Sequence, residues 1–394
     1  MSAAWSTALA AAFWTCCGLI LYTYAGYPLL LFLCSSMLEV RQAWARLLMP
    51  IPPVSDAAPE LPGISLVVAA HNEEAELPGL IESLQRVVYP RGQLELIIVS
   101  DGSTDATNRF LQSLAIPGLQ VVLLERQQGK ANALNEGVAR ATHGVLLLTD
   151  ASTRLQPDTV MRLARHFDDP GVGVVCGALR FLHHRDSQNS EGAYWSYECL
   201  LRLLEGRLGA TLTASGALYA LRKICFPALQ PTTWIEDFLI PMHARQAGYR
   251  VLYDPEAWAT EVPAANVAGE FRRRARLAVG SFRSLRALLR TRLDGFTRWA
   301  FISHKLLRWC VPFLLVAALL CNIALWPREG YRTLLAVQFG MYGLALASWA
   351  GVPGAHRSRL AGGLYFFLAM NAAFLWGFFL FLFDRGETAW QQVR

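Results

Sequence analysis

Residues Leu94–Asp105 read LELIIVSDGSTD, a run of apolar and β-branched residues that ends directly in a polar turn. A short apolar run bounded by a turn is typical of a strand that is buried on both faces of a parallel sheet. Three further runs have this character: Ile64–Ala69, Val121–Leu124 and Val145–Thr149. The segments between them are long enough for crossover helices, so the sequence predicts an α/β domain with a doubly wound sheet.

Polar side chains follow three of these predicted strands at the point where each strand ends. His71-Asn72-Glu73-Glu74 follows the first, Asp101–Asp105 the second, and Asp150-Ala151-Ser152 the fourth. Ligands of a doubly wound sheet bind beyond the carboxyl ends of its strands, so we expect these clusters to form one site. Each cluster by itself could instead cap the next helix. The sequence has neither GxGxxG nor GxxxxGK[ST], which argues against a Rossmann dinucleotide site and a P-loop.

The composition of the chain differs from that of a soluble domain. Of its 394 residues, 54% are hydrophobic and 17% are charged, whereas soluble domains are about 45–50% apolar and about 25% charged. The segment Glu270–Arg308 carries a net charge of +9, with ten Arg and one Lys against two acids, and the rest of the chain sums to −3. Because the excess is one block beside apolar segments, the sequence predicts membrane lipids as partners and no nucleic acid.

Four uncharged segments are long enough to cross a bilayer as helices. The first, Ser2–Leu38, exceeds one span, and Gly26 and Pro28 predict a kink in it. It is far longer than the apolar core of a signal peptide and no Lys or Arg precedes it, so we expect a retained anchor. The other three segments are Trp309–Trp326, Thr333–Val352 and Leu360–Phe383.

The positions of these segments predict the topology. One span before the central region and three after it leave that region on one side of the membrane. Arg41 and Arg46 follow the first span, and Lys305 and Arg308 precede the second, so the positive-inside tendency predicts an inner- or plasma-membrane protein with a cytoplasmic central region. We divide the chain into an anchor (1–40), an α/β domain (60–265), basic amphipathic interfacial helices (266–308) and three C-terminal spans (309–394). A linker rich in Pro and Ala, Pro50–Pro62, leads into the α/β domain.

Six segments share their order and approximate spacing with a known family. They are AAHNEE (Ala69–Glu74), VSDGSTD (Val99–Asp105), GKANALNEG (Gly129–Gly137), LLTDAS (Leu147–Ser152), WIEDF (Trp234–Phe238) and EFRRRARLAVG (Glu270–Gly280). They resemble the family 2 inverting glycosyltransferases of the membrane-embedded polysaccharide-synthase type, such as poly-N-acetylglucosamine, cellulose and hyaluronan synthases. The resemblance implies a GT-A-like doubly wound mixed sheet between one N-terminal and three C-terminal membrane helices. It also implies inverting transfer of a sugar from a nucleotide-sugar donor, a UDP-sugar, to a growing polysaccharide.

The resemblance also implies roles for residues on the donor side of the site. Asp150 matches the first Asp of a DxD-like motif that holds Mg²⁺ or Mn²⁺ against the donor diphosphate, and Mg²⁺ typically uses one or two carboxylates with phosphate oxygens and waters. The third position of this motif is Ser152, so its second carboxylate is missing. Ser152 can contribute only a hydroxyl or a water contact. By the same resemblance, Asp101 is the partner of the donor base, Ala70 and Glu73 line the nucleoside pocket, and Lys130 lies beside it.

Two acids in WIEDF are candidates for the catalytic base. Inversion needs one proton acceptor for the attacking hydroxyl, and Asp237 matches the base of the family's ED motif. Glu236 could take this role instead, or both acids could simply stabilise a helix N-terminus.

The basic block contains the counterpart of the family's QxxRW element, which here reads RxxRL over Arg273–Leu277. Arg273 and Arg276 share a helix face, so both guanidiniums can point at the leaving diphosphate or at an acceptor. The block could also be an interfacial helix that binds anionic headgroups. We expect four further arginines at the membrane surface: Arg283, Arg286, Arg290 and Arg292.

Other functions stay open at this stage. Single-sugar transfer to a lipid acceptor, such as a polyprenyl phosphate or diacylglycerol, is favoured by the altered RxxRL element. A non-catalytic nucleotide-sugar-binding subunit is favoured by Ser152. A channel or transporter is disfavoured, because the three C-terminal spans contain no Asp, Glu, Lys or Arg. The adjacent His183 and His184, near Asp186, predict a surface loop rather than a metal site. The sequence identifies no export partner.

Overall fold

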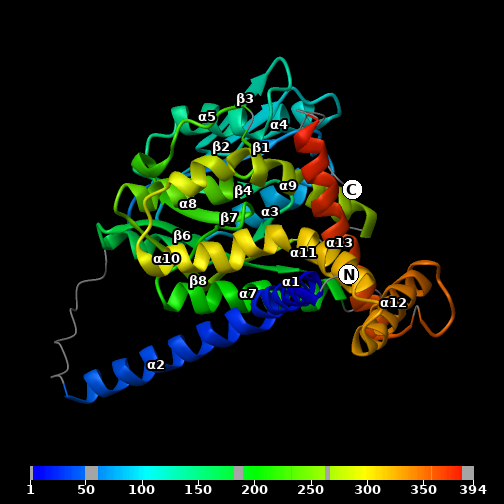
Figure 1. Cartoon of the computed structure of the whole chain (residues 1–394). Coiled ribbons are helices and arrows are strands. Elements are labelled where there is room, and N and C mark those ends of the chain that lie inside the picture. The colour runs from blue at the N-terminus through cyan, green and yellow to red at the C-terminus, as the bar shows by residue number, and fades with distance from the viewer. Residues whose placement is uncertain are drawn as a thin grey trace.

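A computed structural model describes residues 3–48, 61–181, 190–231, 233–261, 267–355 and 357–383. Most of the predicted linker, together with His183, His184 and Asp186, lies outside these residues. An eight-stranded sheet forms the centre, in the order β3-β2-β1-β4-β7-β6-β8-β5 (Figure 1). The strands are β1 (Ile64–Ala70), β2 (Leu94–Asp101), β3 (Leu119–Leu124), β4 (Val145–Asp150), β5 (Arg154–Leu155), β6 (Val172–Phe181), β7 (Leu218–Arg222) and β8 (Arg250–Glu261). The first four confirm the strands predicted from sequence.

The sheet is mixed, as expected. Strands β1 to β4 pair in parallel, β7 runs antiparallel to both β4 and β6, and β8 is parallel to β6. The register places Ala70 opposite Ser100 of β2 and Ala69 opposite Asp150 of β4. The carboxyl ends of β1, β2 and β4 therefore meet at one edge, which brings the three predicted polar clusters together.

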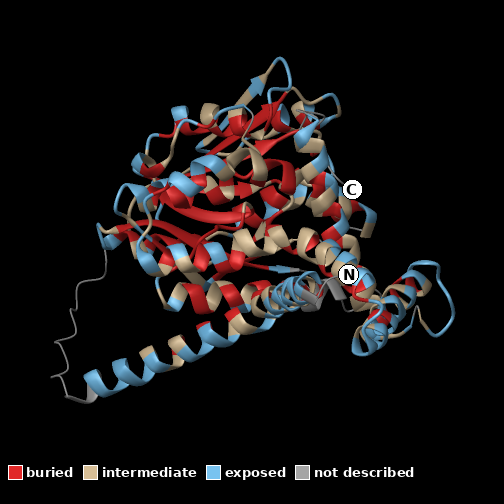
Figure 2. Ribbon diagram, in the orientation of Figure 1, coloured by how far each residue is buried: buried red, intermediate tan, exposed pale blue. Residues whose placement is uncertain are grey.

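Alternating side chains of the strands fill two apolar layers, one on each face of the sheet. In β1, Leu66 and Val68 pack into one layer, and Val67 and Ala69 pack into the other. Helices α3 (Leu77–Gln85), α4 (Thr107–Ser113) and α6 (Thr159–Arg165) cover the first face, and α5 (Lys130–Arg140) and α8 (Glu236–Gln246) cover the second. Figure 2 shows the resulting buried centre, which explains why these strands read as continuous apolar runs.

The N-terminal segment is a long helical element with a break where the kink is predicted. It consists of α1 (Ala3–Leu21), a π-helical turn over Tyr22–Gly26 and α2 (Tyr27–Leu48). Figure 1 shows that α1 and α2 run in different directions. A π turn inserts an extra residue into the helical ladder and is a recognised cause of a kink.

The C-terminal helices are α9 (Val267–Arg290), α10 (Gly295–Ala300), α11 (Leu307–Ala324), α12 (Glu329–Trp349) and α13 (Arg359–Leu382), with a π turn over Phe301–Leu306. Within the described residues, three helical segments are long and apolar enough to cross a membrane: Ala4–Ala45, Gly295–Ala324 and Arg359–Leu382. Two of these three segments lie C-terminal to the α/β domain, where the sequence predicts three spans. The predicted span Thr333–Val352 does form a helix, but Gln338, Ser348 and several glycines lower its hydropathy.

The helix that contains the predicted span Trp309–Trp326 begins well before that span, at Gly295. Asp294 caps this helix, since its carboxylate accepts a hydrogen bond from the backbone N–H of Thr297 at 2.9 Å. The π turn then carries the helix into α11 without a break. The predicted basic segment 266–308 thus includes α9, α10 and the π turn, and it ends in the first turn of α11.

The membrane helices are joined to the α/β domain by a buried polar contact and an apolar cluster. Tyr27 of α2 donates to Glu205 of α7 (Ser190–Arg207) at 2.7 Å, and His304 of the π turn lies 2.6 Å from the same carboxylate. Around them, Phe238 of α8 packs with Phe301 and Trp309. The helix that begins with Glu236 is thereby packed directly against a membrane segment.

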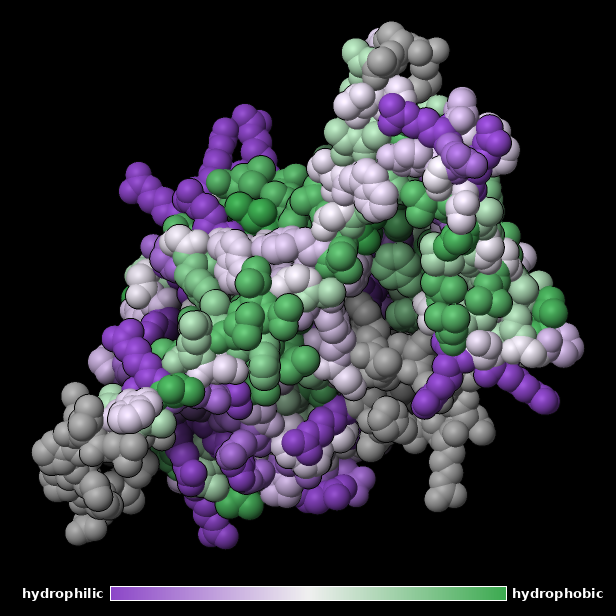
Figure 3. All heavy atoms as spheres, turned by 60° about the horizontal axis from the view of Figure 1, so that its bottom comes forward, coloured by the Kyte–Doolittle hydropathy of each residue, from purple (hydrophilic) through white to green (hydrophobic). Residues whose placement is uncertain are grey.

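Large apolar side chains of these segments point outward. They include Trp5, Trp14, Leu29, Phe32, Met37, Trp44, Val316, Leu320, Trp376, Phe379 and Leu382. Figure 3 shows that hydrophobic residues form broad patches on the face turned toward the viewer. Exposed apolar area of this extent is typical of surface that contacts lipid.

Candidate active site

Three of the predicted site residues form an ion-pair cluster at the edge where the strand ends meet. The Nζ of Lys130 lies 2.8 Å from Oδ1 of Asp150 and 2.7 Å from Oε1 of Glu236. Lys130 begins α5, Asp150 ends β4 and Glu236 begins α8. Burial alone would lower the pKa of Lys130, but the two carboxylates hold that pKa above its ordinary value. The lysine is therefore a fixed cation between two acids from separate elements.

Gly216 lies next to both Asp237 and the ion-pair cluster. A Cβ built on Gly216 would lie 3.5 Å from Nζ of Lys130 and 3.9 Å from both Oδ2 of Asp150 and Cβ of Asp237. The backbone N–H of Ala214 donates to the carbonyl oxygen of Asp237 at 2.8 Å. The chain leading into β7 thus lies against the ion-pair cluster, a contact that sequence reasoning missed.

The two acids of WIEDF have different environments. Glu236 is 7% exposed, and its carboxylate is held by Lys130. Burial, followed by the charge of Glu236, raises the pKa of Asp237 to about 6, against an opposing effect of Lys130. A carboxylate with a pKa near neutrality is well suited to accept a proton, and this environment is compatible with the predicted role of Asp237.

Asp101 is completely buried and anchors the chain that leads into Lys130. Its Oδ1 accepts from the backbone N–H of Gln128 at 2.8 Å, and its Oδ2 accepts from that of Gly129 at 2.7 Å. The next residue, Gly102, has φ +60, and a Cβ there would lie 2.3 Å from the backbone nitrogen of Gln127. Glycine is required at this close approach.

The other residues predicted near the nucleoside make contacts within the protein. Ala70 is completely buried and its methyl group packs in the core. Glu73 is 8% exposed, and its backbone N–H donates to Oγ1 of Thr107 at 2.8 Å. Oδ1 of Asp105 accepts from the N–H of Thr107 at 3.0 Å, which forms an Asx turn directly before α4. The Asx turn considered from sequence is thus present at Asp105.

The basic helix α9 brings one of its two candidate arginines close to the ion-pair cluster. Burial and the charge of Arg273 lower the pKa of Arg276, whereas Glu236 and Asp150 raise it. Arg276 is therefore within electrostatic reach of both acids. Arg273 is more exposed and lies 3.3 Å from Oε2 of Glu270.

The other arginines predicted at the membrane surface have different surroundings. The guanidinium of Arg283 lies 5.0 Å from the ring centroid of Trp234, a cation–π contact with the WIEDF segment. Arg286, Arg290 and Arg292 are exposed. Arg290 is the last residue of α9, and Arg292 follows it. The place of these arginines at the membrane surface stays a prediction.

Asp150, at the end of β4, can bind a divalent cation together with phosphate oxygens and waters. Within the described residues, no group of three or more His, Cys, Asp or Glu side chains is placed to hold a metal. The side chain of Asp150 is 31% exposed, and Mg²⁺ commonly binds through one or two carboxylates while phosphate oxygens and waters complete its shell. Asp150 fits Mg²⁺ or Mn²⁺ in that mode. The hydroxyl of Ser152 donates to Oε1 of Glu261 at 2.9 Å, which brings an acid that sequence reasoning missed into the site.

Comparisons with known proteins agree with this architecture. A family model described as "Glycosyl transferase family 2" matches residues 65–204, and one described as "Glycosyl transferase family group 2" matches residues 145–381. The poly-beta-1,6-N-acetyl-D-glucosamine synthase of Staphylococcus aureus strain COL is 27% identical over 229 residues, which cover 56% of this chain and 55% of the synthase. The synthase of the same name from Staphylococcus epidermidis is 28% identical over 232 residues, with the same coverage. The chain therefore spans about half the length of the curated relatives it matches.

A solved structure shows the same fold over nearly the whole chain. The mannosyltransferase PcManGT from Pyrobaculum calidifontis, in complex with GDP-Man and Mn²⁺, has a TM-score of 0.71 and 22% sequence identity. The match covers 95% of this chain and 99% of that one. The predicted GT-A-like fold is confirmed by this likeness.

Proposed function

Because this chain belongs to glycosyl transferase family group 2 and is a glycosyltransferase, we propose that it is an integral-membrane inverting enzyme. In this proposal it transfers a sugar from a UDP-sugar to a growing polysaccharide, with metal assistance and an Asp general base. The names of its curated relatives, poly-beta-1,6-N-acetyl-D-glucosamine synthases, make UDP-N-acetylglucosamine the first donor to test.

The observation that carries the proposal is the pairing of a basic cluster with a separate, protonatable carboxylate. An acceptor hydroxyl that attacks the anomeric carbon opposite the leaving group must lose one proton. Asp237, with its pKa raised to about 6, accepts that proton. Glu236 is held in its ion pair with Lys130 and keeps the lysine in place. The two neighbouring acids thus have different tasks.

The leaving group requires positive charge on the other side of the sugar. The departing diphosphate gains negative charge, and cations fixed before the reaction stabilise that charge without reorganisation. Lys130 is ion-paired with Asp150 and Glu236, and Arg276 lies within electrostatic reach of both acids. In our proposal these two cations bind the diphosphate oxygens, with Arg273 at the outer edge. A divalent cation bound at Asp150 would supply further charge neutralisation.

The nucleoside belongs, in this proposal, beyond the ends of β1 and β2. Asp101 fixes the loop before Lys130 and presents its remaining acceptor capacity to the base, while Glu73 and the backbone of Ala70 bound the pocket. Support comes from the switch point of the sheet, which lies between these strands and β4. The central domain lies on the cytoplasmic side, as the basic residues Arg41 and Arg46 after the first span favour.

The proposal is tested with the purified full chain in detergent or nanodiscs and a panel of labelled nucleotide sugars. We expect release of UDP, incorporation of label into a polymer, and loss of both on addition of EDTA with recovery on addition of Mg²⁺ or Mn²⁺. Absence of transfer from every donor in the panel, with the metals present, would contradict the proposal.

Transfer of one sugar to a lipid acceptor, a polyprenyl phosphate or diacylglycerol, is the second candidate. It is favoured by RxxRL in place of QxxRW and by the three membrane-spanning candidates found within the described residues, against four predicted spans, since both differ from what the resemblance to polysaccharide synthases implies. Sizing the labelled product separates the two. A ladder or polymer supports the first candidate, and a single glycolipid species supports the second.

A further inference from the structure

Glu261 is the last residue of β8, and it lies beside the chain that follows β4. The hydroxyl of Ser152 donates to its Oε1 at 2.9 Å. This contact follows from the sheet, because β5 and β8 pair antiparallel with Arg154 opposite Thr260. The residues just before β5 must therefore run past the residue just after Thr260. Strand register, and not the reach of a long side chain alone, places the Glu261 carboxylate here.

The charges around Glu261 belong to the site described above. Its side chain is half-buried, and its carboxylate lies within electrostatic reach of Asp150, Arg273 and Lys130. Asp150 at the end of β4 and Glu261 at the end of β8 are therefore linked through Ser152, although β7 and β6 lie between their strands. Like charges held in this way are unfavourable unless a cation balances them, and oxygen ligands of this kind are those that Mg²⁺ and Mn²⁺ prefer.

We propose that Glu261 supplies the second carboxylate of the metal–diphosphate site, the one that the Asp150-Ala151-Ser152 segment lacks at its third position. Glu261 and Asp150 together bind the divalent cation of the donor complex, and Ser152 acts as a positioning residue that orients Glu261 through its hydroxyl. The acid is thereby provided by another strand of the sheet. This inference rests on the proposed function, because it assigns a ligand within that same site.

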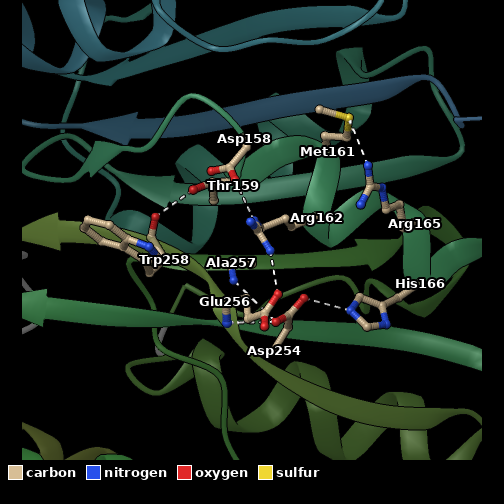
Figure 4. A network of polar contacts seen from close by, with 10 residues as sticks. All are labelled: Asp158, Thr159, Met161, Arg162, Arg165, His166, Asp254, Glu256, Ala257 and Trp258. Atoms are coloured by element: carbon tan, nitrogen blue, oxygen red, sulfur yellow. Dashed lines mark hydrogen bonds and ion pairs between the residues drawn. The ribbon is translucent and has the colours of Figure 1, made fainter.

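Strand β8 is held firmly just before Glu261. Figure 4 shows α6 fastened to it by Arg162, which bridges Asp158 and Glu256 at 2.6 Å each. Oγ1 of Thr159 also donates to the carbonyl oxygen of Trp258 at 2.6 Å. Glu261 therefore leaves a fixed strand, as a metal ligand should. Glu256 is a matched control, because it is an acid on the same strand that is ion-paired with Arg162 of α6.

The experiment measures Mn²⁺ binding by electron paramagnetic resonance, with the full chain in detergent and saturating UDP or, in parallel, GDP. The variants are Glu261→Gln, Glu256→Gln and the double variant Glu261→Gln with Ser152→Asp. Glutamine still accepts the Ser152 hydrogen bond, so the fold around it is kept. We expect Glu261→Gln to weaken Mn²⁺ binding by about tenfold or more, as loss of a metal-site group does. Glu256→Gln should bind as the unaltered chain does.

The double variant tests the location of the missing charge. An Asp at position 152 restores the motif's own second carboxylate, so we expect it to recover most of the Mn²⁺ affinity lost in Glu261→Gln. Unchanged Mn²⁺ binding in Glu261→Gln, equal weakening in Glu256→Gln, or no recovery in the double variant each overturns the inference. Normal Mn²⁺ binding by Glu261→Gln, together with sugar transfer by the unaltered chain, would contradict the role of Glu261 and leave the proposed function in place. Failure of the unaltered chain to transfer from any donor would instead remove the proposed function.

Discussion

Gly377 of α13 lies directly against the backbone of Ala275 in α9. A Cβ built on Gly377 would lie 2.3 Å from the carbonyl oxygen of Ala275 and 2.6 Å from the Cβ of Ala278. Small residues at such a crossing let two helices approach closely. Because Arg276 follows Ala275, the tightest part of this contact is next to a residue that we assign to the diphosphate. The membrane helix therefore sets the position of Arg276 over the site.

Gly377→Val should reduce sugar transfer and lower the melting temperature of the purified protein. The added side chain has no room unless α9 moves, and overpacking of this kind typically costs about 1–3 kcal/mol of stability. Gly363→Val is the control, since it lies on the same helix and a Cβ there meets nothing within 4 Å. Equal effects of the two substitutions on transfer and melting would show that the crossing has no special role.

Asp237→Asn should lower the transfer rate by about 10²–10⁴-fold, the usual contribution of a general base. Nucleotide-sugar binding should persist, because the amide keeps the size of the side chain while Lys130, Asp150 and Glu236 keep their ion pairs. Single-turnover transfer and equilibrium binding of the donor measure the two properties separately. A variant with near-normal turnover would sink the assignment of Asp237.

The transfer rate should fall as the pH drops through about 6. A general base must be ionised to accept a proton, and the pKa of Asp237 is raised to about 6 by burial and Glu236. Above that pH the carboxylate is charged and kcat/KM is level, and below it kcat/KM falls about tenfold per pH unit. Binding of the intact nucleotide sugar, measured over the same range, separates this effect from loss of donor affinity. A flat rate profile between pH 5 and 7 contradicts a base with this pKa.

The sequence was sufficient to predict the sheet edge but not the contacts across it. Apolar runs typical of buried parallel strands predicted β1 to β4. The ends of these strands placed Asp101 and Asp150 at one edge of the sheet. These are local signals, because each is contained in a few neighbouring residues. The Ser152–Glu261 contact depends on the pairing of β5 with β8, more than a hundred residues apart, and no local pattern encodes that register.

Two features of the membrane-side helices differ in how far the sequence reveals them. Absence of charge predicts a span over Thr333–Val352, but the polar and small residues of α12 keep its hydropathy below that of the three apolar helices in the described part of the chain. For Arg283, the sequence predicts a place at the membrane surface and gives no sign of its contact with Trp234. That contact depends on tertiary packing, which no local pattern encodes.

Asp101→Asn should destabilise the protein as well as affect donor binding. Both carboxylate oxygens of Asp101 accept backbone N–H groups, from Gln128 and Gly129. An asparagine offers one acceptor oxygen, so one buried N–H faces an amide NH₂ and loses its partner, at a cost of about 1–3 kcal/mol. Thermal unfolding in detergent measures the loss. A normal melting temperature with weakened donor binding would instead mean that Asp101 acts on the donor base alone.

Arg276→Ala and Arg290→Ala should separate the two roles of the basic block. Arg276 lies within reach of Glu236 and Asp150, so its loss removes positive charge from the leaving diphosphate and should reduce kcat by about 10²–10³-fold, the range seen when one preorganised donor is removed. Arg290 is exposed at the end of α9, so its loss should leave kcat unchanged in detergent. In vesicles containing anionic lipid it should weaken headgroup contact, worth about 1 kcal/mol per basic residue. Transfer assays in detergent and in vesicles with and without anionic lipid measure both effects. Equal loss of kcat in detergent for the two variants would show that the block acts as one unit.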